Sequence, residues 1–199
     1  MNKKHMVSIC MALTILFSVT ACGTQTSAPE STPPQGTTEE SAPETKPDKT
    51  IRFDSETVYG DSVCQDVFAG NDLTLVNIFA TWCGPCVEEI PDLQEIDNKL
   101  DNVGVVGIVA DTYDAQTGER QEEAIETAKE IAEKTGAEYP FVISDDVFVE
   151  DNFKNAAAMF PISYIVDPDG VVVSGPMGGA HAKEEWLDII NEALEAAQA

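Results

Sequence analysis

Two cysteines lie three positions apart, Cys83 and Cys86, within the stretch FATWCGPCVEEIPD at residues 79–92. A pair with this spacing can help to bind zinc, close a structural disulfide, or exchange electrons with the thiols of another protein. A structural zinc site usually needs four nitrogen or sulfur ligands. Beyond the first 22 residues, the chain offers only Cys64 and His181 as further cysteine or histidine ligands, and both lie far from the pair in the sequence. We therefore expect no metal site.

Of the two remaining alternatives, the position of the pair favours redox chemistry. A disulfide across two residues closes almost no loop, so it would gain little by constraining the unfolded chain. The pair follows the apolar run LTLVNIFA at residues 73–80 and precedes apolar residues at helical spacing, which predicts a strand-to-helix junction. The amides at a helix N-terminus lower the pKa of a thiol and stabilise its thiolate. A reactive pair fits this location better than a structural one.

Strands and helices alternate along the rest of the chain. Apolar runs predict buried strands at residues 73–80, 103–110 and 139–144, and a hairpin at 161–175 around a Pro-Asp-Gly turn. Apolar residues at helical spacing predict helices at residues 83–100, 121–135 and 181–198. We expect short helical material at 147–159, and an N-terminal hairpin with a short helix within 51–69. This order predicts an α/β fold with a mixed central sheet covered on both faces.

Residues 1–21 have the features of a secretory signal peptide. Lys3 and Lys4 form a basic start, residues 7–19 are largely apolar, and small residues follow. The apolar core is too short for a comfortable transmembrane helix, although an uncleaved membrane anchor is the alternative. The sequence then reads Ala-Cys, which resembles the lipobox of bacterial lipoproteins. That resemblance implies cleavage before Cys22 and attachment of lipid to it, so that the remainder faces outward from the cell membrane.

Composition separates a tether from a folded domain. Residues 22–50 are dominated by Ser, Thr, Pro and Glu and contain no aromatic residue, which predicts a disordered linker. Residues 51–199 then form one domain of ordinary size. The formal net charge of the chain is −25. Nucleic-acid binding needs charge of the opposite sign, so we exclude it.

Three stretches of the chain resemble a known family. The sequence WCGPC at residues 82–86 resembles the active-site motif of the thioredoxin fold, and NIFATWCGPCVEEIPDL at 77–93 resembles the extracytoplasmic thiol-disulfide oxidoreductases of the TlpA/ResA type. PISYIVDPDG at 161–170 resembles the strand of that family that begins with a proline. The resemblance covers nearly all of 51–199. It implies a thioredoxin-like fold in which residues 111–138 are an insertion between a central strand and a helix.

The resemblance also implies a role for each residue of the motif. Cys83 would be the attacking nucleophile, with the exposed sulfur, and Cys86 the buried thiol that resolves the mixed disulfide. Pro85 would limit the start of the helix. Trp82 would flank the site, although a plain packing role is an alternative. Pro161 would lie against the disulfide and follow a cis peptide bond.

Two positions separate this chain from the better-known thioredoxins. Cytoplasmic thioredoxins commonly have a buried aspartate six residues before the first cysteine, and here that position is Asn77, which cannot titrate. The TlpA/ResA type has a glutamate three residues after the second cysteine, and here that residue is Glu89. On a helix, Cys86 and Glu89 lie on neighbouring faces. Glu89 is therefore a candidate for a carboxylate that handles protons or discriminates substrates. The alternative is that residues 88–89 form a solvated helix face.

Two other residues receive simpler interpretations. Cys64 is expected to be a small buried hydrophobic residue, with a redox or intermolecular role as the alternative. His181 precedes the last predicted helix and is interpreted as a loop residue or a feature of the helix start.

The Gly-Pro spacer suggests the direction of electron flow. It resembles that of the reducing thioredoxins, whose potential is about −270 mV, against about −120 mV for a strong oxidant. The chain contains no cofactor-binding motif, so we expect no cofactor beyond the disulfide itself. The family then implies a membrane thiol donor of the CcdA or DsbD kind, and exported clients such as apocytochrome c or a methionine sulfoxide reductase. A disulfide-forming oxidase and a non-enzymatic binding lipoprotein are the alternatives.

Overall fold

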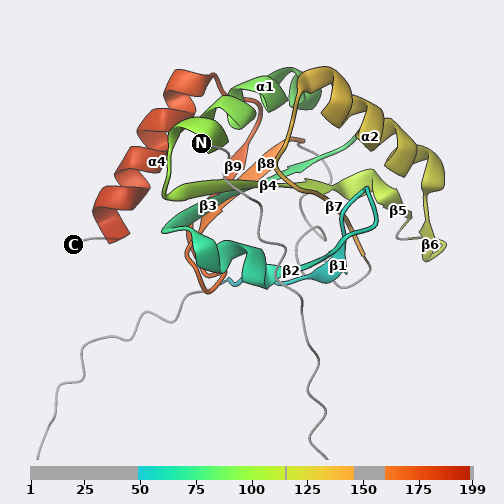
Figure 1. Cartoon of the computed structure of the whole chain (residues 1–199), viewed down its shortest axis with the longest axis horizontal. Coiled ribbons are helices and arrows are strands. Elements are labelled where there is room, and N and C mark those ends of the chain that lie inside the picture. The colour runs from blue at the N-terminus through green and yellow to red at the C-terminus, as the bar shows by residue number, and fades with distance from the viewer. Residues whose placement is uncertain (1–48, 115, 146–159, 198–199) are drawn as a thin grey trace, which may run out of the picture. The chain divides into compact units, whose positions relative to one another are not determined.

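The computed structural model describes residues 49–114, 116–145 and 160–197 (Figure 1). Its centre consists of two parallel strands, β3 (Leu73–Phe79) and β4 (Val103–Val109), paired along their full length. Every residue of both strands is buried. Parallel strands that are covered on both faces are expected to read as continuous apolar runs, and these two do. Both strands were predicted from such runs.

Three further strands complete a five-stranded sheet in the order β7-β4-β3-β8-β9. The strand β7 (Phe141–Ile143) runs parallel to β4, whereas β8 (Ile162–Val166) is antiparallel to β3 and β9 (Val172–Gly178) is antiparallel to β8. The sheet is therefore mixed, as predicted. The strand β9 continues three residues beyond the predicted end of the hairpin, past a cis Gly175–Pro176 bond.

Within the described residues, the α-helices cover one face of the sheet and the N-terminal segment covers the other (Figure 1). The helices are α1 (Gly84–Lys99), α2 (Glu122–Thr135) and α4 (Lys183–Ala197). They pack on alternate residues of β3 and β4, which include Leu75, Phe79 and Val105. This alternation places side chains at odd-numbered positions of β3 on the helical face. The helical material predicted at 147–159 lies outside the described residues.

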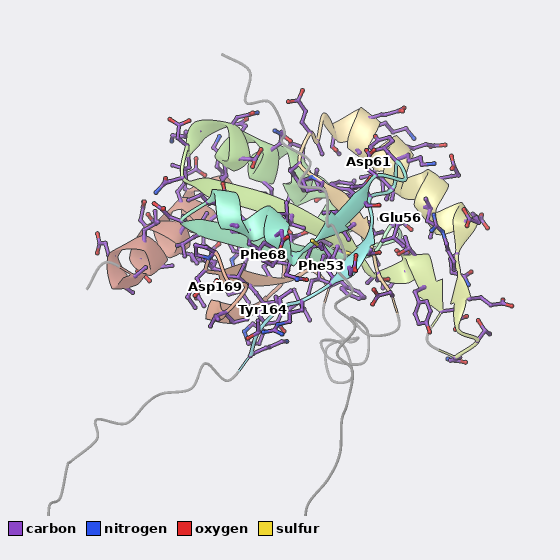
Figure 2. All side chains as sticks on the ribbon, turned by 60° about the horizontal axis from the view of Figure 1, so that its bottom comes forward. Phe53, Glu56, Asp61, Phe68, Tyr164 and Asp169 are labelled. Atoms are coloured by element: carbon purple, nitrogen blue, oxygen red, sulfur yellow. A yellow bond between two sulfur atoms is a disulfide. The ribbon has the colours of Figure 1, made fainter. Side chains whose placement is uncertain are left out.

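The opposite face is covered by the strands β1 (Asp54–Glu56) and β2 (Ser62–Cys64) and by a short 3₁₀ helix (Gln65–Gly70). These are the hairpin and short helix predicted within 51–69. The rings of Phe53 and Phe68 meet edge to face at 5.8 Å, and both pack in a buried cluster with Tyr164 (Figure 2). The central sheet is thus covered on both faces.

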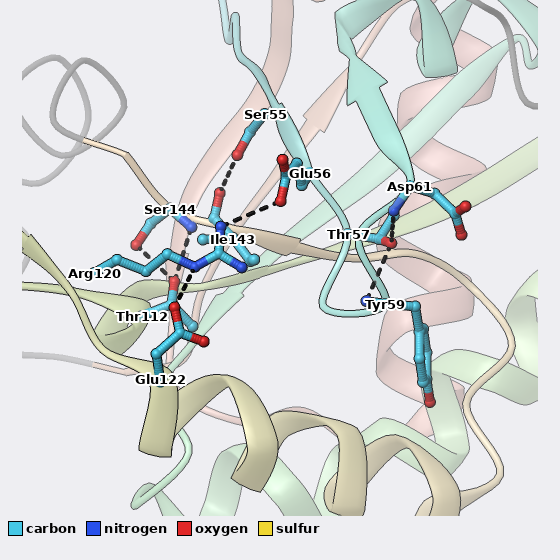
Figure 3. A network of polar contacts seen from close by, with 10 residues as sticks. All are labelled: Ser55, Glu56, Thr57, Tyr59, Asp61, Thr112, Arg120, Glu122, Ile143 and Ser144. Carbon is cyan, nitrogen blue, oxygen red and sulfur yellow. Dashed lines mark hydrogen bonds and ion pairs between the residues drawn. The ribbon is translucent and has the colours of Figure 1, made fainter.

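Residues 111–138, which the family resemblance assigns to an insertion, lie between β4 and β7. They contain α2 and a short ribbon of β5 (Tyr113–Asp114) and β6 (Glu119–Arg120), which the sequence did not predict. Arg120 contacts Glu56 at 3.2 Å and Glu122 at 3.0 Å, so the ribbon is joined to the N-terminal hairpin (Figure 3). All three side chains are well exposed, and we assign these ion pairs little stability.

Candidate active site

The cysteine pair lies where β3 leads into α1. Cys83 is the N-cap of α1, and its main-chain N–H donates to the carbonyl of Ala80 at 3.0 Å. Asp111, which follows β4, fixes the turn because its carboxylate accepts the main-chain N–H of Thr81 at 3.0 Å and 3.2 Å. The ends of the two central strands therefore meet at the site, as expected for a binding crevice in an α/β sheet. The predicted strand-to-helix junction is confirmed.

The two cysteines form a disulfide with a Cα–Cα distance of 5.3 Å. Cys83 is 7% exposed and Cys86 is fully buried, so Cys83 is the accessible member, although little of it reaches solvent. The main-chain N–H of Cys86 donates to the sulfur of Cys83 at 3.3 Å. The first turn of α1 contains Pro85 and no acidic residue. A thiolate on Cys83 would therefore face helix amides without a nearby acidic side chain in that turn.

Trp82, which directly precedes Cys83, forms an aromatic pair with Phe160. Trp82 is 71% exposed, and its ring meets the edge of Phe160 at 5.9 Å. Such exposure fits a flanking residue better than a core packing residue. The bond between Phe160 and Pro161 is cis, as predicted, and Pro161 is buried. The placement of Pro161 against the disulfide stays a prediction.

Glu89 is buried on the inner face of α1. Only 3% of it is exposed, whereas the neighbouring Glu88 is exposed. Its Oε1 accepts from Asn77 Nδ2 at 2.7 Å, and its Oε2 accepts the main-chain N–H of His181 at 3.1 Å and Nε1–H of Trp186 at 3.4 Å. The solvated-face interpretation is therefore wrong for Glu89, because the start of α4 covers this part of the helix.

Burial decides the protonation of this carboxylate. Desolvation raises the pKa of Glu89 above 4.5, and the hydrogen bonds from His181, Asn77 and Trp186 act in the opposite direction without cancelling it. A carboxyl group removed from water favours its neutral form unless it is fully compensated. A buried acid with a raised pKa beside a reactive pair is a functional-site signature.

The remaining contacts of Glu89 come from distant parts of the chain. Asn77, on β3, also donates to Ser163 Oγ of β8 at 3.1 Å, so one amide joins both strands to α1. Sequence reasoning singled out Asn77 and Glu89 separately and missed their hydrogen bond, and it missed Trp186 and Ser163 altogether. The positions of two residues offered a signal. Asn77 is at an odd-numbered position of β3, whose side chains face the helices, and Trp186 lies on the apolar face of α4.

Two sequence interpretations outside this network can be compared with the structure. Cys64 ends β2 and is 6% exposed, so it is buried as predicted, but its sulfur is in a disulfide, which the interpretation as a small hydrophobic residue did not include. His181 lies two residues before the start of α4, in agreement with a helix-start feature. Among the residues that the structure describes, no cluster of histidine, cysteine and acidic side chains could hold a metal ion.

Comparison with known proteins places the chain in a family. The model of the Redoxin family matches residues 37–185, well over half of the sequence. The chain belongs to the Redoxin family. This redoxin is 30% identical over 129 residues to the thiol:disulfide interchange protein CycY of Rhizobium leguminosarum bv. viciae, covering 61% of this chain and 60% of CycY. It is 44% identical over 54 residues to chloroplastic thioredoxin Y of Oryza sativa subsp. japonica, covering 27% of this chain and 32% of that one. The chain thus spans less than two thirds of both curated relatives.

A solved structure supports the same assignment over a longer stretch. The thioredoxin-family thiol:disulfide interchange protein of Chlorobium tepidum TLS superposes with a TM-score of 0.61 at 25% identity, covering 76% of this chain and 99% of that one. The thioredoxin-like fold and the TlpA-type resemblance are confirmed. This redoxin is a thiol-disulfide oxidoreductase with the Cys83–Cys86 pair in its CXXC motif.

Proposed function

We propose that this redoxin reduces disulfides of exported proteins while attached to the outer face of the cell membrane. One observation carries the redox part of the proposal: the Cys83–Cys86 disulfide lies at the first turn of α1, with Cys83 the more accessible sulfur. A nucleophilic thiol needs access to the client and a stabilised thiolate, whereas a resolving thiol attacks within the protein and needs no access to solvent. The proposed roles follow from that difference.

The reaction moves two electrons from the enzyme dithiol to a client disulfide. The thiolate of Cys83 attacks one client sulfur, a mixed disulfide forms, and the other client sulfur leaves as a thiolate. The thiolate of Cys86 then attacks the sulfur of Cys83, the bond to the client breaks, and the client is released with both cysteines reduced. The enzyme is left with the Cys83–Cys86 disulfide. A second dithiol must reduce it before the next cycle.

Glu89 gives the resolving step a proton acceptor. Cys86 is enclosed by apolar residues, and such burial favours the protonated thiol over the thiolate. Glu89 lies three residues further along α1, so the two side chains are neighbours on the helix. A carboxylate with a raised pKa can take the proton of Cys86 as the thiolate forms, and it returns that proton when the disulfide is reduced again.

The cellular setting of the proposal comes from the N-terminal sequence. A lipid on Cys22 would anchor the protein, and the linker up to residue 50 would let the domain reach partners near the membrane. No helix among the described residues is long and apolar enough to cross a bilayer. The proposed donor is a membrane dithiol protein of the CcdA or DsbD type. The proposed clients act in cytochrome c maturation or methionine sulfoxide reduction, and no cofactor beyond the disulfide takes part.

Equilibration with a glutathione redox buffer tests the direction of electron flow. We expect a potential near that of thioredoxin, about −270 mV, and reduction of insulin that is lost in Cys83→Ser. A potential near −120 mV, close to that of a strong oxidant, would favour the oxidase alternative instead. A folded protein that does not reduce insulin would return the chain to the binding-lipoprotein interpretation.

A further inference from the structure

We propose that His181 is a positioning residue of the redox site, which holds the Glu89 carboxylate in place through its main chain and controls the charge of that carboxylate through its imidazole. The inference rests on the proposed function, since it concerns the proton acceptor of the resolving step. Two separate sets of contacts carry it, one from the backbone and one from the ring.

The backbone contact joins the residue to Glu89 directly. The main-chain N–H of His181 donates to Oε2 of Glu89 at 3.1 Å, and Nε1–H of Trp186 approaches the same oxygen at 3.4 Å. A second bond fixes this segment against α1, because Asp92 accepts the main-chain N–H of Lys183 at 3.2 Å. Any residue except proline could supply the first contact. The main chain alone therefore does not explain a histidine at this position.

The ring is held in one orientation with one basic nitrogen. Nδ1 of His181 lies 2.9 Å from Oε1 of Glu185, and the ring meets Trp186 edge to face with centroids 4.8 Å apart. A neutral imidazole beside a carboxylate donates the hydrogen of the facing nitrogen, so its lone pair is on the other nitrogen. That nitrogen, Nε2, is buried and has no hydrogen-bond partner among the residues that the structure describes. Only 18% of the side chain is exposed.

Protonation of this ring changes the electrostatics of Glu89. Burial raises the pKa of Glu89, and the charge of His181 lowers it. Glu89 is therefore ionised more readily while His181 is protonated. The ionised carboxylate is the form that accepts the proton of Cys86. His181 thus extends the proposed resolving step toward acidic pH, where an isolated buried carboxyl group would stay neutral.

The other polar groups around the pair act on it differently. On the helical face of the sheet, Asn77 donates to Glu89 and cannot titrate. The buried hydroxyl of Tyr139 has a pKa well above 10, which burial and the charges of Glu89 and Asp97 raise. On α4, Glu185 faces the imidazole, whereas the ammonium of Lys183 pairs with Glu95 of α1. Glu88, Asp92 and the thiol of reduced Cys86 are the remaining titratable groups within one turn of Glu89 on α1. Among these groups, His181 is the one that can add positive charge within the network.

An NMR titration of the oxidised protein tests the electrostatic step without any thiol chemistry. The side-chain carboxyl resonance of Glu89 is followed with pH in the wild type and in His181→Asn, which retains the main-chain N–H and loses the imidazole. We expect the pKa of Glu89 to be higher in His181→Asn. Glu184→Gln is the matched control, because it changes an exposed charge in the first turn of α4 and should leave that pKa unchanged. An unchanged pKa of Glu89 in folded His181→Asn would overturn the proposal.

A pH–rate profile of client reduction then tests the link to the reaction. We expect His181→Asn to be slower than the wild type in acidic solution and equal to it in alkaline solution. The deficit in acidic solution should be up to about tenfold for each unit by which the pKa of Glu89 rises. A deficit of the same factor at every pH would indicate a packing role and contradict the proposal. The proposed function fails separately, if Cys83→Ser reduces the client as fast as the wild type does.

Discussion

Replacing Glu89 by glutamine should make the stability of the oxidised protein less dependent on pH. The wild-type carboxyl group has a raised pKa in the folded state, so the folded protein binds this proton more tightly than the unfolded chain does. Wild-type stability should therefore fall, relative to the variant, as the pH rises from about 4.5 through the folded-state pKa, and should then level off. Glutamine has no proton to lose and shows no such loss.

The magnitude follows from the linkage relation and from the hydrogen bonds. Within that pH window the difference should change by at most about 1.4 kcal/mol per pH unit, the value for one proton. In acidic solution the two proteins should be close in stability. Glutamine can keep its oxygen toward His181 and Trp186 and turn its NH₂ group toward Asn77, whose Oδ1 has no hydrogen-bond partner among the described residues. An Asn77 amide that rotates would then accept this hydrogen, which avoids the cost of about 1–3 kcal/mol for an unpaired buried donor.

Urea unfolding between pH 4 and 8, followed by circular dichroism, measures the difference. Glu88→Gln is the matched control, since it removes the same charge from an exposed neighbour on the same helix. We expect the free energy of unfolding of Glu88→Gln to parallel that of the wild type at every pH. If Glu89→Gln also parallels the wild type, or if it loses stability relative to the wild type as the pH rises, then hydrogen bonding outweighs burial and the raised pKa is refuted.

Two further predictions concern the surroundings of the pair and the anchoring of the chain. Asn77→Asp would place a second carboxyl group at the 2.7 Å contact with Glu89, so the two groups should share a proton and the variant should lose stability above neutral pH. Unfolding by urea at pH 5 and pH 8 measures this loss. Equal losses of stability at both pH values would argue against the shared proton. Cys22→Ser should release the protein into the medium or leave an uncleaved precursor, as membrane fractionation and mass spectrometry would show. A variant that stays bound and is normally processed would refute the lipoprotein interpretation.

The parts of the fold that sequence reasoning predicted are those with a local signal. Continuous apolar runs define β3 and β4, and the helical spacing of Ile90, Leu93 and Ile96 predicts α1 to within one residue at each end. The β5–β6 ribbon was missed because its strands are two residues long and consist of polar or half-buried positions. The extension of β9 was missed because Gly175 and Pro176 normally indicate a break in a strand.

The environment of Glu89 could not be read from the sequence for a different reason. Along α1, Glu88 and Glu89 are chemically identical and adjacent, so their own segment does not decide which one is buried. The choice depends on Trp186, 97 residues further along the chain, whose indole reaches the carboxylate only when α4 packs over α1. The family resemblance identified the right glutamate. The structure adds the physical reason, which is a set of three N–H donors converging on one buried carboxylate.

A trapping experiment tests the central assignment of Cys83 as nucleophile and Cys86 as resolving thiol most directly. In Cys86→Ser, attack on a client survives but the intramolecular escape does not, so mixed disulfides with exported client proteins should accumulate on Cys83 in cell envelopes. They should disappear on treatment with a small dithiol. The reciprocal variant, Cys83→Ser, should trap little, because Cys86 is fully buried in the structure. Equal trapping by both variants, or no adducts from a folded Cys86→Ser protein whose remaining thiol is reactive, would contradict the account.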